Sequence, residues 1–340
     1  MAAATAPPCA SYAAGALLLE SGAVLPDARL AYRSHGRVGE GDPIVTCSAF
    51  AQHHGDLAFL VGPGRPLDPE RHWLVHTELL GNGRSSSPSN TPAPHDGPAF
   101  PAVTIRDNVA LQARLLDHLG VDRIRAVIGA SMGGQQALQW AVSHPERVGG
   151  AVAIVASARA SWHVQLFLHG LESALRSDPA FEDGRYGSPP LLGLSRLSEA
   201  WAPWALAPQF FSEGHYRAFE DTAAEHLEAF LAKWRTRYHD RDANDLISHF
   251  RTWRAHDVAG TPGCDGDLAT AAERAELPVL FLPASTDAYF AVADVVAEAA
   301  LFPDGRVQVV ESPAGHAAGF GRMPADREQV AGAIAAFLGD

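Results

Sequence analysis

Cysteine is scarce in this sequence, and long apolar runs are missing. Cys9, Cys47 and Cys264 are far apart and odd in number, which argues against a disulfide framework and against a C-x-x-C metal or redox pair. Because free thiols are typical of reducing compartments, we expect a cytoplasmic protein. The apolar segment at residues 13–19 is short, contains Gly15 and follows no basic region, so neither a signal peptide nor a membrane-spanning helix is predicted.

Positive charge is scarce as well. The chain has 26 Lys and Arg against 39 Asp and Glu, which gives a net charge of −13. An acidic protein is not expected to have nucleic acid or an anionic membrane as its main partner. The chain is 47% hydrophobic, as expected for a soluble globular protein with a sizeable core. Its 340 residues can form one large domain or two of ordinary size.

A serine-containing turn is the most informative motif. The stretch at residues 127–142, VIGASMGGQQALQWAV, has the pattern of an apolar strand, a sharp turn and a helix. The segment Gly129-Ala130-Ser131-Met132-Gly133 matches G-x-S-x-G, the nucleophile elbow of α/β-hydrolases. Its glycines let strand and helix approach closely, and the turn lifts the serine hydroxyl clear of the sheet. An idle serine in a glycine-rich turn is the alternative.

Strand and helix patterns alternate on both sides of this motif. Predicted strands lie at residues 16–19, 30–34, 44–47, 73–77, 125–128, 151–155, 279–282 and 307–310, after a flexible lead-in at residues 1–12, and the clearest predicted helices lie at 104–119, 133–143, 292–301 and 326–338. The alternation predicts an α/β fold with a mostly parallel sheet flanked by helices. Strand patterns vanish after residue 158. We therefore predict an α/β-hydrolase core at residues 1–158 and 277–340, with residues 159–276 inserted as a helical cap.

Two further residues complete a catalytic triad in the order nucleophile, acid, histidine that this fold uses. Asp287 and His316 each follow one of the last two predicted strands. In this arrangement His316 takes the proton of Ser131, and Asp287 holds the imidazole in the required tautomer. Asp294 and Asp326 are weaker candidates for the acid, because both lie in predicted helices.

An oxyanion would be stabilised by two backbone N–H groups. One is that of Met132, directly after the nucleophile, and the other comes from the loop after the predicted strand at residues 44–47. Phe50 is the preferred second donor, with Ala49 as the alternative. No H-E-x-x-H, C-x-x-C or strand-linked G-x-G-x-x-G pattern is present, so no metal and no bound cofactor are expected.

Over residues 25–340 the sequence resembles the homoserine O-acetyltransferase family of α/β-hydrolases. The similarity is carried by residues 61–64, 67–68, 100–107, 112–116 and 129–141, by Asp178-Pro179 and Thr286-Asp287, and by residues 312–316. The resemblance implies acyl transfer through an acyl-Ser131 intermediate, with acyl-CoA as a co-substrate and with a homodimer formed through the cap.

Three positions bear on the substrate. Where the family has an arginine for the homoserine carboxylate, this chain has Glu172, and where it has an aspartate for the amino group, this chain has Ala317. A buried site that cannot pair a charged ligand discriminates against it, so we expect a divergent member that does not use homoserine. Arg84, in a long loop at residues 81–101, is a further candidate for the pocket.

These observations lead to three hypotheses about function. The first is an O-acyltransferase that moves a short acyl group from acyl-CoA to a hydroxyl of a less polar acceptor, as in specialised metabolism. The second is a carboxylic-ester hydrolase that uses the same triad with water as acceptor. The third is a non-catalytic binding protein on the hydrolase scaffold. In each case the partners are small molecules.

Overall fold

A computed structural model describes residues 9–53, 55–219 and 222–339. Its centre is one eight-stranded sheet with the order β1-β2-β4-β3-β5-β6-β7-β8. The strands are β1 (Ala10–Leu18), β2 (Val24–Gly36), β3 (Ile44–Cys47), β4 (Trp73–Thr77), β5 (Ala126–Ala130), β6 (Ala151–Ile154), β7 (Pro278–Leu282) and β8 (Asp304–Val307). The pairs β1–β2 and β2–β4 are antiparallel and the others are parallel, which confirms the predicted fold class.

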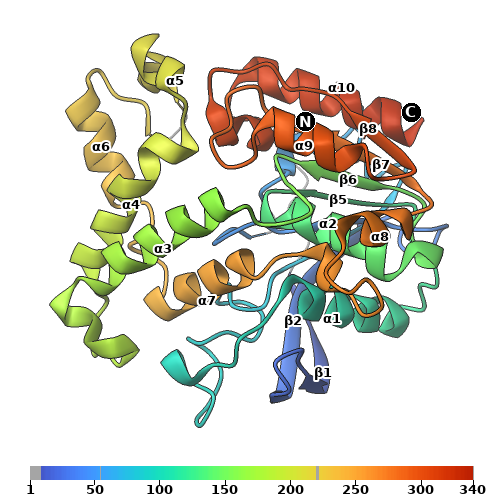
Figure 1. Cartoon of the computed structure of the whole chain (residues 1–340), viewed down its shortest axis with the longest axis horizontal. Coiled ribbons are helices and arrows are strands. Elements are labelled where there is room, and N and C mark those ends of the chain that lie inside the picture. Colours follow the sequence, from blue (N-terminus) through green and yellow to red (C-terminus); the bar gives the residue numbers. More distant parts are fainter. Residues whose placement is uncertain (1–8, 54, 220–221, 340) are drawn as a thin grey trace.

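Helices cover both faces of the sheet. They are α1 (Ile105–His118), α2 (Met132–Ser143), α3 (Trp162–Arg176), α4 (Leu191–Ala205), α5 (Pro208–Ser212), α6 (Leu227–Arg235), α7 (Ala243–Arg254), α8 (Leu268–Glu273), α9 (Val292–Ala299) and α10 (Pro324–Leu338). Because side chains alternate along a strand, Val127 packs in the apolar cluster that contains α1 and α2, and Ile128 packs in the cluster that contains α10. Figure 1 shows α2 and α10 on opposite sides of the sheet.

The local sequence explains why the strand and the helix on either side of Ser131 form where they do. β5 is buried along its whole length, as expected for a central parallel strand. α1, which packs beside α2, begins with a capping box in which Thr104 and Asp107 each bond the backbone of the other. α2 begins directly after Ser131 and ends before Pro145, which cannot continue a helix.

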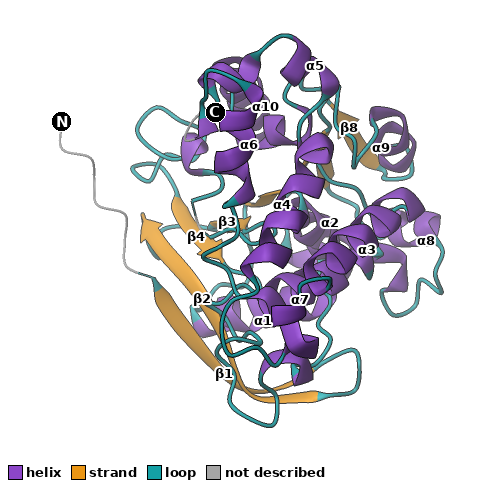
Figure 2. Cartoon of the chain, turned by 90° about the vertical axis from the view of Figure 1, so that its left-hand side faces the viewer, coloured by secondary structure: helices purple, strands orange, loops and turns teal. Residues whose placement is uncertain are grey.

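Between β6 and β7 the described chain contains helices α3 to α8 and no strand. In Figures 1 and 2, helices α3 to α7 lie together on one side of the sheet, whereas α8 lies near α2 on the core. The segment α3–α7 is called the helical insertion below. Its helical content agrees with the predicted cap, and the exact domain boundaries stay a prediction.

Two details differ from the prediction. The first hairpin is longer than expected, because β1 already begins at Ala10, inside the predicted lead-in; residues 1–8 of that segment lie outside the described residues. The predicted strand at residues 307–310 is wrong, because β8 is Asp304–Val307 and Val310 forms only an isolated bridge with Ala284. A Cβ on Gly305 would lie 2.0 Å from the Ala299 carbonyl oxygen, so close packing requires this glycine inside the strand and hides the strand pattern.

Among the described residues, none of the helices combines the length and the apolar character that crossing a membrane would require.

Candidate active site

Ser131 lies in the tight turn between β5 and α2, with φ 54° and ψ −123°. A non-glycine residue with positive φ is strained and persists only where its surroundings hold it. Here the surroundings are glycines: a Cβ on Gly129 would lie 2.1 Å from the Gly133 carbonyl carbon, and a Cβ on Gly133 would lie 2.3 Å from the Cys47 carbonyl oxygen. The G-x-S-x-G pattern therefore reflects strand, helix and neighbouring strand in direct backbone contact.

The structure brings the predicted acid and base together. Asp287 follows β7, His316 lies in the short helix Gly315–Phe320, and His316 Nδ1 lies 2.8 Å from Asp287 Oδ2. The other carboxylate oxygen, Oδ1, accepts the Tyr289 backbone N–H at 2.8 Å, which fixes the orientation of the carboxylate. The Nδ1–H donates to the carboxylate, so Nε2 carries the lone pair that a general base needs.

The rival acids occupy other environments. Asp294 is in the first turn of α9, and Asp326 is in the first turn of α10, where it accepts the Met323 backbone N–H. Burial raises the pKa of Asp326. Neither is bonded to His316, so the geometry favours Asp287.

The loop after β3 adjoins the nucleophile helix. Gln136 of α2 donates from Nε2 to the Ser48 carbonyl oxygen at 3.0 Å. The Ala49 N–H donates to Asp56 Oδ2 at 2.7 Å, so the alternative oxyanion donor is already engaged. The N–H groups of Phe50 and Met132 have no partner within the part of the chain that the structure describes. Two N–H groups that donate to an oxyanion during the reaction are expected to be unbonded in the free enzyme.

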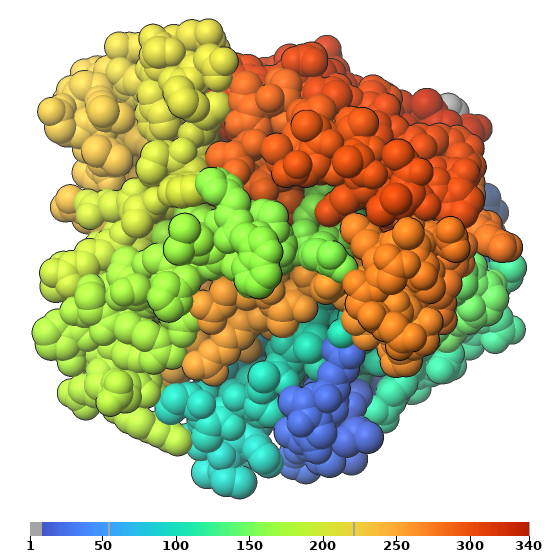
Figure 3. Space-filling view, in the orientation of Figure 1, coloured from blue at the N-terminus to red at the C-terminus, as the bar shows by residue number. Residues whose placement is uncertain are grey.

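Ser131 and His316 open into one cavity of about 300 Å³. The wall contains seven aromatic side chains, together with Ala317 and the cations Arg237, Arg241 and Arg322; the aromatic residues are Phe50, Trp201, Phe219, Trp234, Tyr238, Trp253 and Phe320. No Asp or Glu of the described residues lines it. Several of these groups belong to the helical insertion, which packs along the core in Figure 3 (green to light orange).

Of the three substrate-pocket candidates, only Ala317 lines this cavity. Glu172 is buried in α3 and is held by two arginines: its Oε1 accepts from Arg176 at 2.9 Å and its Oε2 accepts from Arg254 at 2.7 Å. Its carboxylate is therefore part of an ion-pair cluster between α3 and α7, away from the described lining of the cavity.

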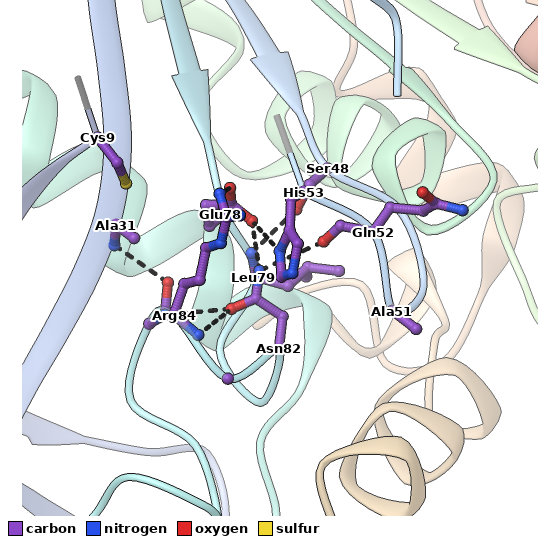
Figure 4. Close-up of polar contacts among 12 residues, drawn as sticks. Cys9, Ala31, Ser48, Ala51, Gln52, His53, Glu78, Leu79, Asn82 and Arg84 are labelled. Carbon is purple, nitrogen blue, oxygen red and sulfur yellow. Dashed lines mark hydrogen bonds and ion pairs between the residues drawn. The ribbon is translucent and has the colours of Figure 1, made fainter. Parts of the chain in front are cut away.

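Arg84 also lies apart from the cavity lining. Its Nη1 is 3.5 Å from Oε1 of Glu78, a fully buried acid. Figure 4 shows that His53 and Asn82 also reach the Glu78 carboxylate, and that Asn82 bonds the backbone of the loop carrying Gln52. This cluster supports the loop after β3, and Arg84 is one of its members.

The sequence did not reveal the residues that support the triad and the oxyanion donors. Tyr289 packs edge-on against His316, with ring centroids 4.5 Å apart, and Asp56, His249 and Arg241 hold the loop that carries Phe50. Of these only Tyr289 had a local signal, since it stands two residues after Asp287. The three cysteines are free, and no group of metal-binding side chains occurs among the described residues.

An elbow serine, an Asp–His pair and two open N–H groups around one cavity define a serine hydrolase-type enzyme with the α/β-hydrolase architecture. The chain belongs to the α/β-hydrolase fold family, whose model matches residues 43–322. It is 34% identical over 314 residues to an ethyl acetate hydrolase of Pseudomonas veronii, covering 90% of this chain and 88% of that protein.

Further comparisons agree. The chain is 32% identical over 289 residues to a homoserine O-acetyltransferase of Zymomonas mobilis, covering 76% of each protein. It superposes on the crystal structure of the acetyl esterase MekB with a TM-score of 0.94 and 32% identity, over 98% of this chain and 97% of that one. The predicted resemblance to homoserine O-acetyltransferases is thus confirmed, and relatives named as esterases join them.

Proposed function

We propose that this protein is a carboxylic-ester hydrolase that acts on neutral esters with a short acyl group. The observation that carries the proposal is the cavity wall, where seven aromatic side chains stand beside Ser131 and His316, and where the described charged side chains that line it are three arginines and no Asp or Glu. Burying an unpaired ammonium ion is costly, so a homoserine-like acceptor is disfavoured. The similarity to proteins named as an ethyl acetate hydrolase and an acetyl esterase supports the proposal.

Catalysis proceeds in two half-reactions. The Ser131 Oγ attacks the ester carbonyl while His316 Nε2 removes its proton, and the Phe50 and Met132 N–H groups donate to the developing oxyanion. The tetrahedral intermediate collapses, the alcohol leaves with the proton from His316, and an acyl-Ser131 ester remains. Water then attacks this ester with His316 again as base, which releases the carboxylic acid and restores the serine.

This proposal places the esterase hypothesis before the O-acyltransferase hypothesis that the sequence favoured. The two share every step up to the acyl-enzyme and differ only in the acceptor. The Glu172 position, which suggested an altered acceptor site, is engaged with Arg176 and Arg254, so it gives no support to a different alcohol acceptor.

The decisive experiment compares acceptors. Purified protein is incubated with p-nitrophenyl acetate or ethyl acetate, with and without added alcohols, and separately with acetyl-CoA and the same alcohols. We expect steady release of acetate that requires Ser131, with no more than a trace of transfer product, and no CoA release. Ser131→Ala is the matched control. Transfer from acetyl-CoA that outruns hydrolysis would establish the acyltransferase instead.

A further inference from the structure

The loop that carries Phe50 is held on both sides of that residue. The Ala49 N–H is bonded to Asp56 Oδ2 at 2.7 Å, and the Ala51 N–H is bonded to His249 Nδ1 at 3.1 Å. The Ala49 carbonyl oxygen accepts the Gln52 N–H at 3.2 Å. Because the N–H and C=O of a trans peptide point in opposite directions, the last bond also fixes the direction of the Phe50 N–H. The N–H groups of Ala49 and Ala51 are thus bonded, and the Phe50 N–H between them has no partner among the described residues.

Ala51 needs this support because its backbone is strained. Its φ is 51°, a value that a residue with a Cβ adopts only where the surroundings impose it. Two groups of the helical insertion hold it: His249 accepts its N–H, and Arg241 Nε donates to its carbonyl oxygen at 3.1 Å. The contact between His249 and Ala51 spans 198 residues of sequence. The insertion thus fixes the conformation of the loop next to Phe50.

His249 is suited to accept a hydrogen bond at Nδ1. Its Nε2 lies 3.2 Å from the Leu80 carbonyl oxygen, which can only accept, so Nε2 carries the hydrogen and Nδ1 the lone pair. The side chain is buried, and this burial lowers its pKa to about 4, which keeps the ring neutral. Its ring packs edge-on against the Phe50 ring at 5.5 Å. His249 is absent from the described cavity lining, so it reaches Phe50 without access to the substrate.

We propose that His249 is a positioning residue of the oxyanion hole, which holds the Ala51 amide so that the Phe50 N–H stays directed at the oxyanion. The inference rests on the proposed acyl-Ser131 chemistry. A displacement of the donor weakens an interaction made in the transition state and leaves substrate binding in the ground state largely unchanged. The effect should therefore appear in kcat and not in KM.

Two variants of similar shape test the two ring nitrogens of His249 separately. In His249→Asn the amide oxygen can replace Nδ1 as acceptor for the Ala51 N–H. In His249→Gln the amide nitrogen can replace Nε2 as donor to Leu80, and the acceptor for Ala51 is lost. We expect kcat for p-nitrophenyl acetate to fall about ten- to a hundredfold in the Gln variant and to stay within about threefold in the Asn variant. KM should change by less than about twofold in both.

A second measurement excludes a merely structural role. The rate of Ser131 phosphonylation by a fluorophosphonate, normalised to the folded fraction, also depends on oxyanion donors and needs no known substrate. It should follow kcat across the variants, as should the affinity for a trifluoromethyl ketone. Equal rates in wild type, Asn and Gln variants would overturn the positioning role. If no ester is hydrolysed but phosphonylation still falls only in the Gln variant, the proposed function is wrong and the positioning role stands.

Discussion

Gly133 packs so closely on Cys47 that a Cβ at residue 133 would lie 2.3 Å from the Cys47 carbonyl oxygen. This contact seats the start of the nucleophile helix against the end of β3, from which the loop with Phe50 begins. The two oxyanion donors, on Phe50 and Met132, thus belong to segments in backbone contact. The distance between the two donors therefore depends on Gly133.

Gly133→Ala should damage both stability and activity. The added methyl group meets backbone atoms that cannot rotate away, and overpacking of this kind costs about 1–3 kcal/mol. We expect a lower free energy of unfolding in urea and a kcat reduced at least tenfold. Gly170→Ala in α3 is the matched control, because beyond the helix's own backbone nothing lies within 4 Å of its added Cβ. Equal behaviour of the two variants would refute the proposed contact.

Asp287→Asn tests the assignment of the acid. The amide keeps the size of the carboxylate and, with its NH₂ towards His316, drives the histidine into the wrong tautomer, so kcat should fall by a factor on the order of 10³–10⁴. Asp294→Asn, in the first turn of α9, should leave kcat within twofold. Both are measured with p-nitrophenyl acetate after circular dichroism has shown that each variant is folded. Activity of Asp287→Asn within tenfold of wild type would exclude this residue as the triad acid.

The parts of the site that the sequence revealed are those with local causes. Gly129 and Gly133 are required by sterics within a few residues of Ser131, so the elbow could be recognised from its spacing. Asp287 and His316 could be found because each follows a strand in a fixed order. The last strand was predicted three residues too late, at 307–310 instead of Asp304–Val307. His316 follows either range, so the predicted order of strand and histidine is still correct.

The parts that the sequence concealed depend on distant contacts. His249 is one of 16 histidines, and its role follows from a bond to a residue 198 positions away. Glu172 was identified from its position six residues before Asp178, but its role depends on Arg254, 82 residues further on. A position in the sequence does not reveal which other helix its side chain meets.

Glu172 is therefore expected to act on stability and not on the substrate. Glu172→Gln removes the charge that Arg176 and Arg254 share, and we expect a loss of about 1–2 kcal/mol in the free energy of unfolding. KM for p-nitrophenyl acetate should be unchanged. Glu228→Gln, an exposed glutamate of α6, is the control for loss of one negative charge. A severalfold change of KM in Glu172→Gln, with no change in Glu228→Gln, would show that Glu172 acts on the substrate after all.

His256 is expected to make folding sensitive to acid. It is buried with Nε2 3.2 Å from the Ser157 carbonyl oxygen, and burial lowers its pKa to about 3 from a reference of 6.5. Between these values the unfolded chain binds more protons than the folded chain, so stability from this group is present above pH 6.5 and is lost as pH falls towards 3. At pH 5 the loss is about 2 kcal/mol.

The measurement compares wild type with His256→Gln, whose amide can still donate to Ser157. The other titrating groups are common to both proteins, so they cancel in the difference between the two free energies of unfolding. Relative to the variant, wild type should lose about 2 kcal/mol between pH 7.5 and pH 5. A difference that stays constant over this range would mean that His256 titrates alike in the folded and unfolded states.

Trp201 should limit the length of the acyl group. It lines the cavity, its ring centroid is 4.8 Å from that of Phe50, and its indole N–H bonds the Tyr289 hydroxyl, so its ring is held in place. Trp201→Ala opens space on the wall. Since each methylene accommodated in an apolar pocket is worth roughly tenfold or more in specificity, we expect the kcat/KM ratio of p-nitrophenyl hexanoate to acetate to rise at least tenfold.

Two controls separate this effect from a general loss of packing. Trp162→Ala removes an indole that is 85% exposed on α3, and it should leave the ratio unchanged. Tyr289→Phe keeps the ring beside His316 and removes only the bond that anchors Trp201, so it should raise the ratio by less than Trp201→Ala. If all three variants share one chain-length profile, the acyl group lies elsewhere in the cavity, and the limit on its length must be sought among the other aromatic lining residues, such as Phe219, Trp234 and Phe320.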